Sequence, residues 1–206
     1  MNTNSEGRRF LALGDSYTIG ESVTARDRWP AQLATLLAAE GIEMRAPQII
    51  ARTGWTTADL AGGIRRDAPA GPYDLVSLLI GVNNQYRGLS SEQYREEFHG
   101  LIEQAIGFAG GNASRVIVLS IPDWGATPFA EGRDRALIGR EIDAFNAINR
   151  DEADRAGARY VDISADSRQA AANPALTAPD GLHPSGELYA RWAARVLPEA
   201  RAAFGS

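Results

Sequence analysis

Four polar residues stand at spacings that suit acyl-transfer chemistry. Ser16 and Asn83 each follow a short apolar run, and Asp180 precedes His183 by three residues near the C-terminus. A serine hydroxyl is a weak nucleophile until a base takes its proton, and an imidazole serves first as base and then as acid near neutral pH. A carboxylate on the other ring nitrogen orients the imidazole. One turn of chain brings Asp180 near the ring of His183, so this set is able to activate a serine.

The same reaction needs hydrogen-bond donors for the negative charge that develops on the attacked carbonyl oxygen. The N–H of Ser16, the side-chain amide of Asn83 and the N–H of Gly54, which follows another apolar run, are suitable donors. Loss of one such donor typically costs on the order of 10²–10³ in rate. Each residue alone also has a structural explanation, because glycine accepts a positive φ and asparagine is common in turns. The prediction therefore rests on their joint placement.

The composition excludes several other chemistries. The 206 residues include no cysteine, and all 21 basic residues are arginine, so thiol nucleophiles, lysine Schiff bases and a phosphate-loop lysine are excluded. A metal site built on His99 and His183 needs added carboxylates, and no H-E-x-x-H motif is present. We therefore expect no metal and no organic cofactor. The formal net charge of −5 argues against a nucleic-acid partner.

Five short runs rich in valine, isoleucine and leucine are typical of strands that are buried on both faces. They are Arg9–Leu13, Gln48–Ala51, Asp74–Ile80, Arg115–Ser120 and Tyr160–Ile163. Segments with helical periodicity lie between them, and Thr56, Ser90 and Ser185 stand where helices are expected to begin. The alternation predicts an α/β fold in which helices cover both faces of a parallel sheet. The length predicts a single domain over residues 1–206.

The order of the strands decides whether the polar residues meet. The alternation is compatible with two common orders, and five strands favour the order 2-1-3-4-5. In that order the first strand lies between the second and the third, so Ser16, Gly54 and Asn83 lie side by side beyond the carboxyl ends of the strands. Because His183 directly precedes the last helix, it is expected to return to the same edge.

Residues that follow the strands are candidates for a substrate pocket, namely Trp55, Asn84, Asp123 and Trp124. Tyr86 and Phe129 are further candidates for apolar walls, although core packing explains each aromatic residue equally well. Arg87 is a candidate for contact with an anionic substrate group, with a solvated arginine as the default.

Three other titratable residues are expected to have a structural role or to be second candidates for a catalytic one. Asp15 is expected to hold the turn before Ser16, and His99 is expected to be a surface or structural histidine. Asp162 ends the fifth strand and is the second candidate for orienting His183.

The order of these motifs resembles the SGNH hydrolases, also called the GDSL-type esterases and lipases. The resemblance covers nearly the whole chain, and its four blocks are Gly14-Asp15-Ser16, Gly54, Gly81-Val82-Asn83-Asn84 and Asp180-Gly181-Leu182-His183. One residue departs from the family pattern, because Asn84 stands where the family usually has aspartate. This position is not the family's base, so the departure concerns the hydrogen bonding around Asn83 rather than the reaction class.

The resemblance implies a flavodoxin-like, three-layer α/β/α sandwich with a five-stranded parallel sheet. It implies Ser16 as nucleophile, His183 as base and Asp180 as its partner. Ser16, Gly54 and Asn83 then form the oxyanion hole. The implied activity is hydrolysis of acyl or acetyl esters through an acyl-enzyme, with a small-molecule ester as the substrate, while the sequence leaves the oligomeric state open.

Two alternatives remain at this stage. An acyltransferase would use the same triad with an alcohol in place of water, and a non-catalytic binding module would occupy the same fold. No apolar segment is long enough to span a membrane, and the N-terminal residues lack the pattern of a secretion signal, so a cytoplasmic location without membrane insertion is expected.

Overall fold

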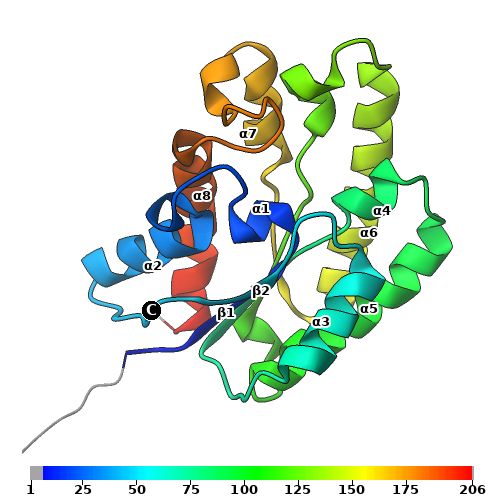
Figure 1. Ribbon diagram of the computed structural model, residues 1–206. Coiled ribbons are helices and arrows are strands. Elements are labelled where there is room, and N and C mark those ends of the chain that lie inside the picture. The colour runs from blue at the N-terminus through cyan, green and yellow to red at the C-terminus, as the bar shows by residue number, and fades with distance from the viewer. Residues whose placement is uncertain (1–6, 206) are drawn as a thin grey trace, which may run out of the picture.

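A computed structural model describes residues 7–205 of the chain (Figure 1). Five parallel strands form one sheet in the order β2-β1-β3-β4-β5, as the sequence predicted. The strands are β1 (Phe10–Gly14), β2 (Gln48–Ala51), β3 (Leu75–Leu79), β4 (Val116–Leu119) and β5 (Arg159–Val161). Each lies within two residues of a predicted apolar run.

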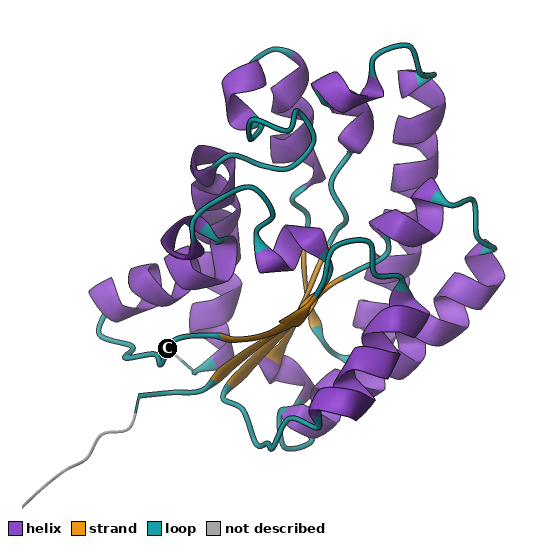
Figure 2. Ribbon diagram, viewed as in Figure 1, coloured by secondary structure: helices purple, strands orange, loops and turns teal. Residues whose placement is uncertain are grey.

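Helices cover both faces of the sheet and make three layers (Figure 2). On one face, α2 (Trp29–Ala39) packs against α8 (Gly186–Ala203), which also contacts β4 and β5. On the other face lie α3 (Thr57–Asp67), α5 (Ser91–Phe108) and α6 (Arg135–Ala156), with α5 and α6 packed on the central strands. This is the predicted α/β/α sandwich, and no helix within residues 7–205 has the length and apolarity needed to cross a bilayer.

Short helical segments make up much of the remaining chain. The α-helical ones are α1 (Ser16–Ile19), α4 (Val82–Tyr86) and α7 (Ser164–Ser167). The 3-10 segments are η1 (Ala25–Asp27), η2 (Ala113–Arg115), η3 (Trp124–Ala126), η4 (Pro128–Ala130), η5 (Arg168–Ala171) and η6 (Pro174–Leu176). The segments α1, α4 and η3 follow the carboxyl ends of β1, β3 and β4, so the chain forms short helical turns at these strand ends.

The register of the sheet aligns the carboxyl ends of β1, β2 and β3. Strands β1, β3 and β4 are buried along their whole length. Gly14 at the end of β1 lies opposite Ala51 of β2 and Leu79 of β3. A Cβ atom on Gly14 would collide with the Leu79 carbonyl and the Thr18 side chain, so only glycine fits this crossing. The loops that carry Ser16, Gly54 and Asn83 therefore start side by side.

Side-chain caps fix where the long helices begin. Thr56 and Asp59 form a complete capping box at the start of α3, and Ser185 caps α8. Ser90 caps α5 by accepting a hydrogen bond from the Gln93 N–H, while the Gln93 side chain is bonded further along the helix. The predicted helix starts are thus correct, and the Ser90 box is only half formed.

Candidate active site

Ser16 is the first residue of α1 and is separated from the end of β1 only by Asp15. The Asp15 side chain accepts a hydrogen bond from the Tyr17 N–H at 3.0 Å, and the Asp15 carbonyl accepts from the N–H groups of Thr18 and Ile19. The first N–H groups of a helix have no partner within the helix. The Ser16 N–H is the one in this turn that Asp15 does not bind, so it is free to donate to a ligand.

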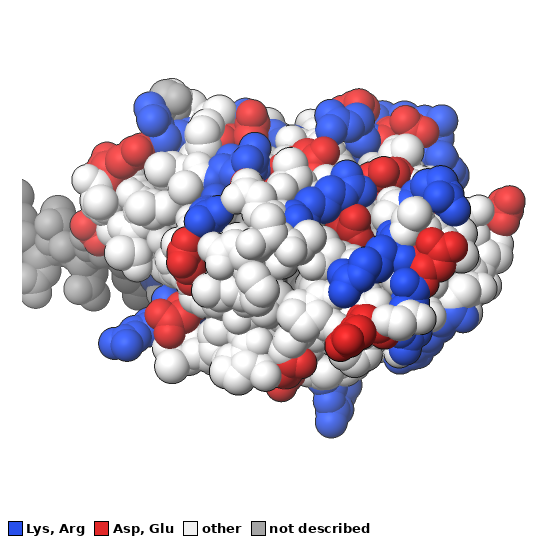
Figure 3. Space-filling view, turned by 90° about the horizontal axis from the view of Figure 1, so that it is seen from above, with Lys and Arg blue, Asp and Glu red and all other residues white. Residues whose placement is uncertain are grey.

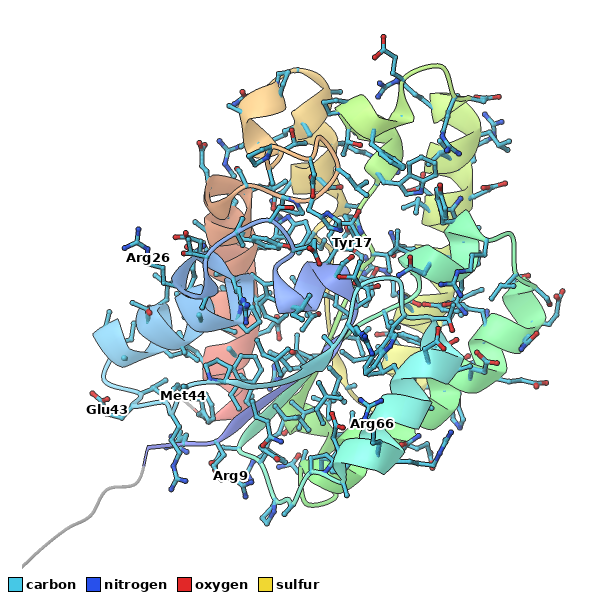
Figure 4. The ribbon with its side chains drawn as sticks, in the orientation of Figure 1. Arg9, Tyr17, Arg26, Glu43, Met44 and Arg66 are labelled. Carbon is cyan, nitrogen blue, oxygen red and sulfur yellow. The ribbon has the colours of Figure 1, made fainter. Side chains whose placement is uncertain are left out.

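A continuous hydrogen-bonded chain joins Ser16 to the C-terminal loop. The Ser16 Oγ lies 2.9 Å from Nε2 of His183, and Nδ1 of His183 lies 2.7 Å from Oδ2 of Asp180. The ionised carboxylate only accepts, so it assigns the ring proton to Nδ1 and leaves Nε2 as the acceptor for the serine hydroxyl. The Tyr17 ring packs at 5.2 Å from the imidazole and limits its movement. Figure 4 labels Tyr17 beside α1, in the middle of the molecule.

The Asp180 carboxylate receives four hydrogen bonds. Oδ1 accepts from the N–H groups of Leu182 and His183, both at 2.9 Å, while Oδ2 accepts from the Ser22 hydroxyl at 2.6 Å and from the His183 ring. Partial burial by itself raises the pKa of Asp180, but these donors outweigh it, and the pKa lies well below its ordinary value. Asp180 is therefore held as an anion.

Asp15 directly precedes Ser16 in the chain. It is fully buried, and its Oδ2 has no hydrogen-bond partner within residues 7–205. Burial raises the pKa of Asp15 to about 7, although the bond from the Tyr17 N–H opposes the shift. The residue thus holds the turn, as predicted, and carries a carboxyl group that is easily protonated.

Two further groups face Ser16 from neighbouring loops. Gly54 has a φ of +81°, and its carbonyl accepts a hydrogen bond from Nη2 of Arg87 at 2.6 Å. Asn83 is the second residue of α4, and its Nδ2 donates a hydrogen bond to the Trp55 carbonyl at 2.9 Å. An asparagine amide has two N–H donors, so one remains for a ligand. Arg87 and Asn83 thus hold the two successive carbonyl groups of Gly54 and Trp55.

These groups open into a cavity of about 180 Å³. The residues that line it come from every loop at this edge of the sheet: Ser16, Tyr17, Thr53, Gly54, Val82, Asn83, Tyr86, Trp124, Phe129, Leu182 and His183. Figure 3 views the molecule from above, where charged side chains of both signs surround a mostly uncharged centre. Aromatic rings, Val82 and Leu182 make the lining chiefly apolar, and its polar groups include Ser16 and His183.

Three aromatic rings form one wall of the cavity. Tyr86 and Trp124 lie 5.2 Å apart, and Phe129 lies 6.0 Å from Trp124. Arg133 stands 5.4–5.7 Å from all three ring centroids. Nε1 of Trp124 donates to Gln85 at 2.7 Å, which fixes the indole. Contacts with Gln85 and Arg133 thus hold the rings in place, although Tyr86 and Phe129 are 46% and 42% exposed.

Of the predicted pocket residues, Trp124, Tyr86 and Phe129 line this cavity. The Trp55 ring packs against Gly63, and Asn84 is buried with both amide atoms bonded to Thr57. The Asp123 side chain caps η3 and pairs with an arginine behind the loop. The expected pocket roles of Trp55, Asn84 and Asp123 are corrected accordingly, because their side chains point away from the cavity.

The remaining candidates lie outside the cavity. Asp162 bonds to Ser120 and Ser164 rather than to His183, so the reserve role proposed for it is wrong. His99 lies half exposed on α5, where it contacts Glu152 of α6. Within residues 7–205 no group of three or more histidine or acidic side chains could hold a metal ion.

Sequence reasoning missed four lining residues: Tyr17, Thr53, Val82 and Leu182. Each is the direct chain neighbour of a residue that the sequence did single out. That adjacency is a usable signal, since the backbone of a tight loop brings neighbouring side chains to the same opening.

Residues 12–191 match the sequence model of the GDSL-like lipase/acylhydrolase family. The chain belongs to this family. Its members are ester hydrolases, and the chain is one as well, with a small-molecule ester as its substrate. A search of curated proteins gave no significant match.

Solved structures agree with the family assignment in their fold. The crystal structure of TesA superposes with a TM-score of 0.73 at 20% sequence identity, covering 95% of this chain and 99% of TesA. The acetylxylan esterase Axe2 from Geobacillus stearothermophilus gives a TM-score of 0.73 at 22% identity, covering 94% of each chain. At such identities the likeness concerns the fold alone.

Proposed function

We propose that the chain is a serine esterase that hydrolyses carboxylic esters through Ser16, His183 and Asp180, with an acyl-enzyme intermediate. The observation that carries the proposal is the unbroken chain of hydrogen bonds from Ser16 Oγ through the imidazole to Asp180, at the floor of the cavity. Further support comes from Axe2, whose described catalytic mutants change a serine, an aspartate and a histidine. There too the aspartate precedes the histidine by three residues.

In the first half-reaction, Ser16 Oγ attacks the ester carbonyl carbon while its proton passes to Nε2 of His183. Asp180 stabilises the resulting imidazolium through Nδ1. The N–H groups of Ser16 and Gly54 and the second amide N–H of Asn83 donate to the oxyanion. The ester C–O bond then breaks, and the alcohol leaves with the proton from His183.

In the second half-reaction, water replaces the alcohol. His183 takes a proton from the water as it attacks the acyl carbon, and the same donors stabilise the second oxyanion. Collapse returns the proton to Ser16 Oγ and releases the carboxylic acid. Every proton that moves in this sequence passes through His183, so no metal or cofactor enters a step.

The size and lining of the cavity favour a small substituent beside the reacting carbonyl. A cavity of about 150 Å³ is enough for a benzene ring in other proteins, and this one measures about 180 Å³. Its aromatic wall suits an acetyl group, a short acyl chain or a planar ring. A long acyl chain would extend past the exposed rings of Tyr86 and Phe129 into solvent.

The test is intact-mass analysis after exposure to a fluorophosphonate probe, followed by a series of 4-nitrophenyl esters. We expect one adduct on the wild-type chain and none on Ser16→Ala, because the probe reports an activated serine whatever the natural substrate. We expect kcat/KM to be highest for the acetate or butyrate and to fall for the octanoate and laurate. Absence of an adduct on folded wild-type protein would favour the binding-module alternative.

The acyltransferase alternative shares the acyl-enzyme and is separated by product analysis. With an added alcohol acceptor at millimolar concentration, an esterase releases mainly the free acid. A new ester formed in preference to the acid would identify a transferase and overturn hydrolysis as the main reaction.

A further inference from the structure

Ser22 is an exposed residue that contacts the candidate catalytic aspartate across 158 positions of sequence. Its hydroxyl donates to Oδ2 of Asp180 at 2.6 Å, on the same oxygen that receives Nδ1 of His183. In Figure 1 the blue loop that follows α1 passes beside the segment leading into α8. The contact therefore links the loop after the nucleophile to the loop that holds the acid and the base.

The backbone at Ser22 is in a conformation that serine seldom adopts. Its φ is +64°, and Ala68 is the other non-glycine residue with a positive φ within residues 7–205. Glycine takes this left-handed conformation without the steric cost that a Cβ atom carries. The left-handed backbone of this exposed serine costs stability. The side chain of the same residue donates a hydrogen bond to Asp180.

The residues on either side of Ser22 are tied to the same site. The carbonyl of Ser16 accepts hydrogen bonds from the N–H groups of both Gly20 and Glu21, each at 3.0 Å. The Glu21 carboxylate accepts a hydrogen bond from the Thr53 hydroxyl, next to Gly54. Residues 20–22 thus connect the nucleophile, the loop of Gly54 and, through Ser22, the carboxylate of Asp180.

We propose that Ser22 is a positioning residue for the Ser16–His183–Asp180 set, retained for its hydroxyl at a place where the backbone favours glycine. The proposal rests on the proposed function. Oδ1 of Asp180 is held by the backbone of its own turn, whereas Oδ2 faces the imidazole. The Ser22 hydroxyl fixes the second oxygen in the plane that His183 needs and supplies a donor to the anion.

The test compares three variants whose backbones all tolerate a positive φ. Ser22→Gly removes the hydroxyl and relaxes the backbone, so we expect kcat for 4-nitrophenyl acetate to fall about tenfold, with KM unchanged and the melting temperature equal or higher. Ser22→Asn restores a donor and should recover most of kcat. Ser22→Asp has the shape of Asn without the donor and adds a like charge, so kcat should fall further than in Ser22→Gly.

Ala68→Gly is the matched control, because it relaxes the other left-handed residue at a place with no hydroxyl and no contact with the cavity. It should raise the melting temperature and leave kcat unchanged. The proposal is overturned if kcat of Ser22→Gly stays within about twofold of wild type, or if kcat follows the melting temperature across the three variants.

A second readout needs no substrate and separates this proposal from the proposed function. The His183 Nδ1 proton that is bonded to Asp180 gives a low-field proton resonance, and His99→Gln removes the other histidine as a source. Ser22→Gly should shift that resonance, and Ser22→Asn should return it toward its wild-type position. If wild type forms no fluorophosphonate adduct, the proposed function fails, and an unmoved resonance overturns the role of Ser22 independently.

Discussion

Two aspartates flank Ser16 and differ in almost every aspect of their surroundings. Asp180, on the open side, is about one-third exposed and receives four hydrogen bonds, so its pKa is lowered. Asp15, which directly precedes the serine, is fully buried and receives one bond from the Tyr17 N–H, so its pKa rises to about 7. Burial thus raises the pKa of one aspartate, and hydrogen bonds lower the pKa of the other.

The difference shows that burial and the number of hydrogen-bond donors, rather than proximity to Ser16, decide which carboxyl keeps the charge that the imidazole needs. A carboxylate that must stabilise an imidazolium has to remain charged over the working pH range. Asp180 meets this requirement through the backbone of its own turn and through Ser22. Asp15 is instead poised to lose its charge, which limits it to shaping the turn.

The largest expected effect comes from neutralising Asp180, the member of this pair whose pKa is lowered. Asp180→Asn should lower kcat by roughly 10³–10⁴ with the fold retained, because an amide favours the wrong tautomer of His183. Asp15→Asn should change kcat by less than about tenfold, since the neutral side chain still caps α1. The measurement is kcat on 4-nitrophenyl acetate at pH 8, with circular dichroism to check folding. Equal losses in the two variants would break the comparison.

The second prediction concerns stability rather than rate. The pKa of Asp15 is about 7 in the folded chain and 3.8 as its ordinary value, so its contribution to stability is full below about pH 4 and is lost as the pH rises through 7. The free energy of unfolding should decline by up to about 4 kcal/mol between pH 4 and pH 8. Asp15→Asn should remove most of that slope in urea titrations.

Asp180→Asn is the control for this slope, because its contribution has the opposite sign and a different range. The pKa of Asp180 is lowered, so its stabilisation is present above about pH 4 and is lost as the pH falls below that value. The variant should keep the wild-type slope between pH 4 and pH 8. A slope that survives in Asp15→Asn would show that Asp15 is ionised at little cost.

The smallest effect is expected at Asn84, which tests whether donors also govern a third position near the site. Its amide accepts from the Thr57 N–H at 3.1 Å and donates to the Thr57 hydroxyl at 2.7 Å, which in turn donates to Glu97. Asn84→Asp would compete with Glu97 for the single hydroxyl proton. We expect a loss of about 1–2 kcal/mol in the free energy of unfolding at pH 8.

Glu97→Gln should restore most of that loss, because its amide donates to the Thr57 hydroxyl and frees the hydroxyl proton for the new carboxylate. The check is a double-mutant cycle in urea, in which the coupling between positions 84 and 97 should exceed about 0.5 kcal/mol. Strictly additive effects would refute this account of the departure at Asn84.

The strand pattern was readable from the sequence because the central strands are buried on both faces and show as continuous apolar runs. With the strand order, this was enough to predict that Ser16, Gly54 and Asn83 lie at one edge, since parallel strands end together. The short spacing from Asp180 to His183 predicted their contact, because one turn closes it.

The pocket could not be predicted in the same way, because it depends on the direction of each side chain. Helix α4 turns by about 100° per residue, so Val82, Asn83 and Tyr86 line the cavity while Asn84 points into the protein. The sequence alone does not give the rotation of this helix relative to the cavity. The Ser22 contact was also hidden, since it depends on a left-handed backbone and on a partner in a distant loop.

The turn from Asp180 to His183 has a consequence for how this edge of the molecule tolerates change. The acid holds the backbone of the base as well as its ring, so the pair carries its own internal geometry. A displacement of the loop would move both residues together and alter the contacts that they make outside their own turn, with Ser16 and Ser22. A change in the length of the chain upstream of Ala178 would therefore leave the geometry within the pair unchanged.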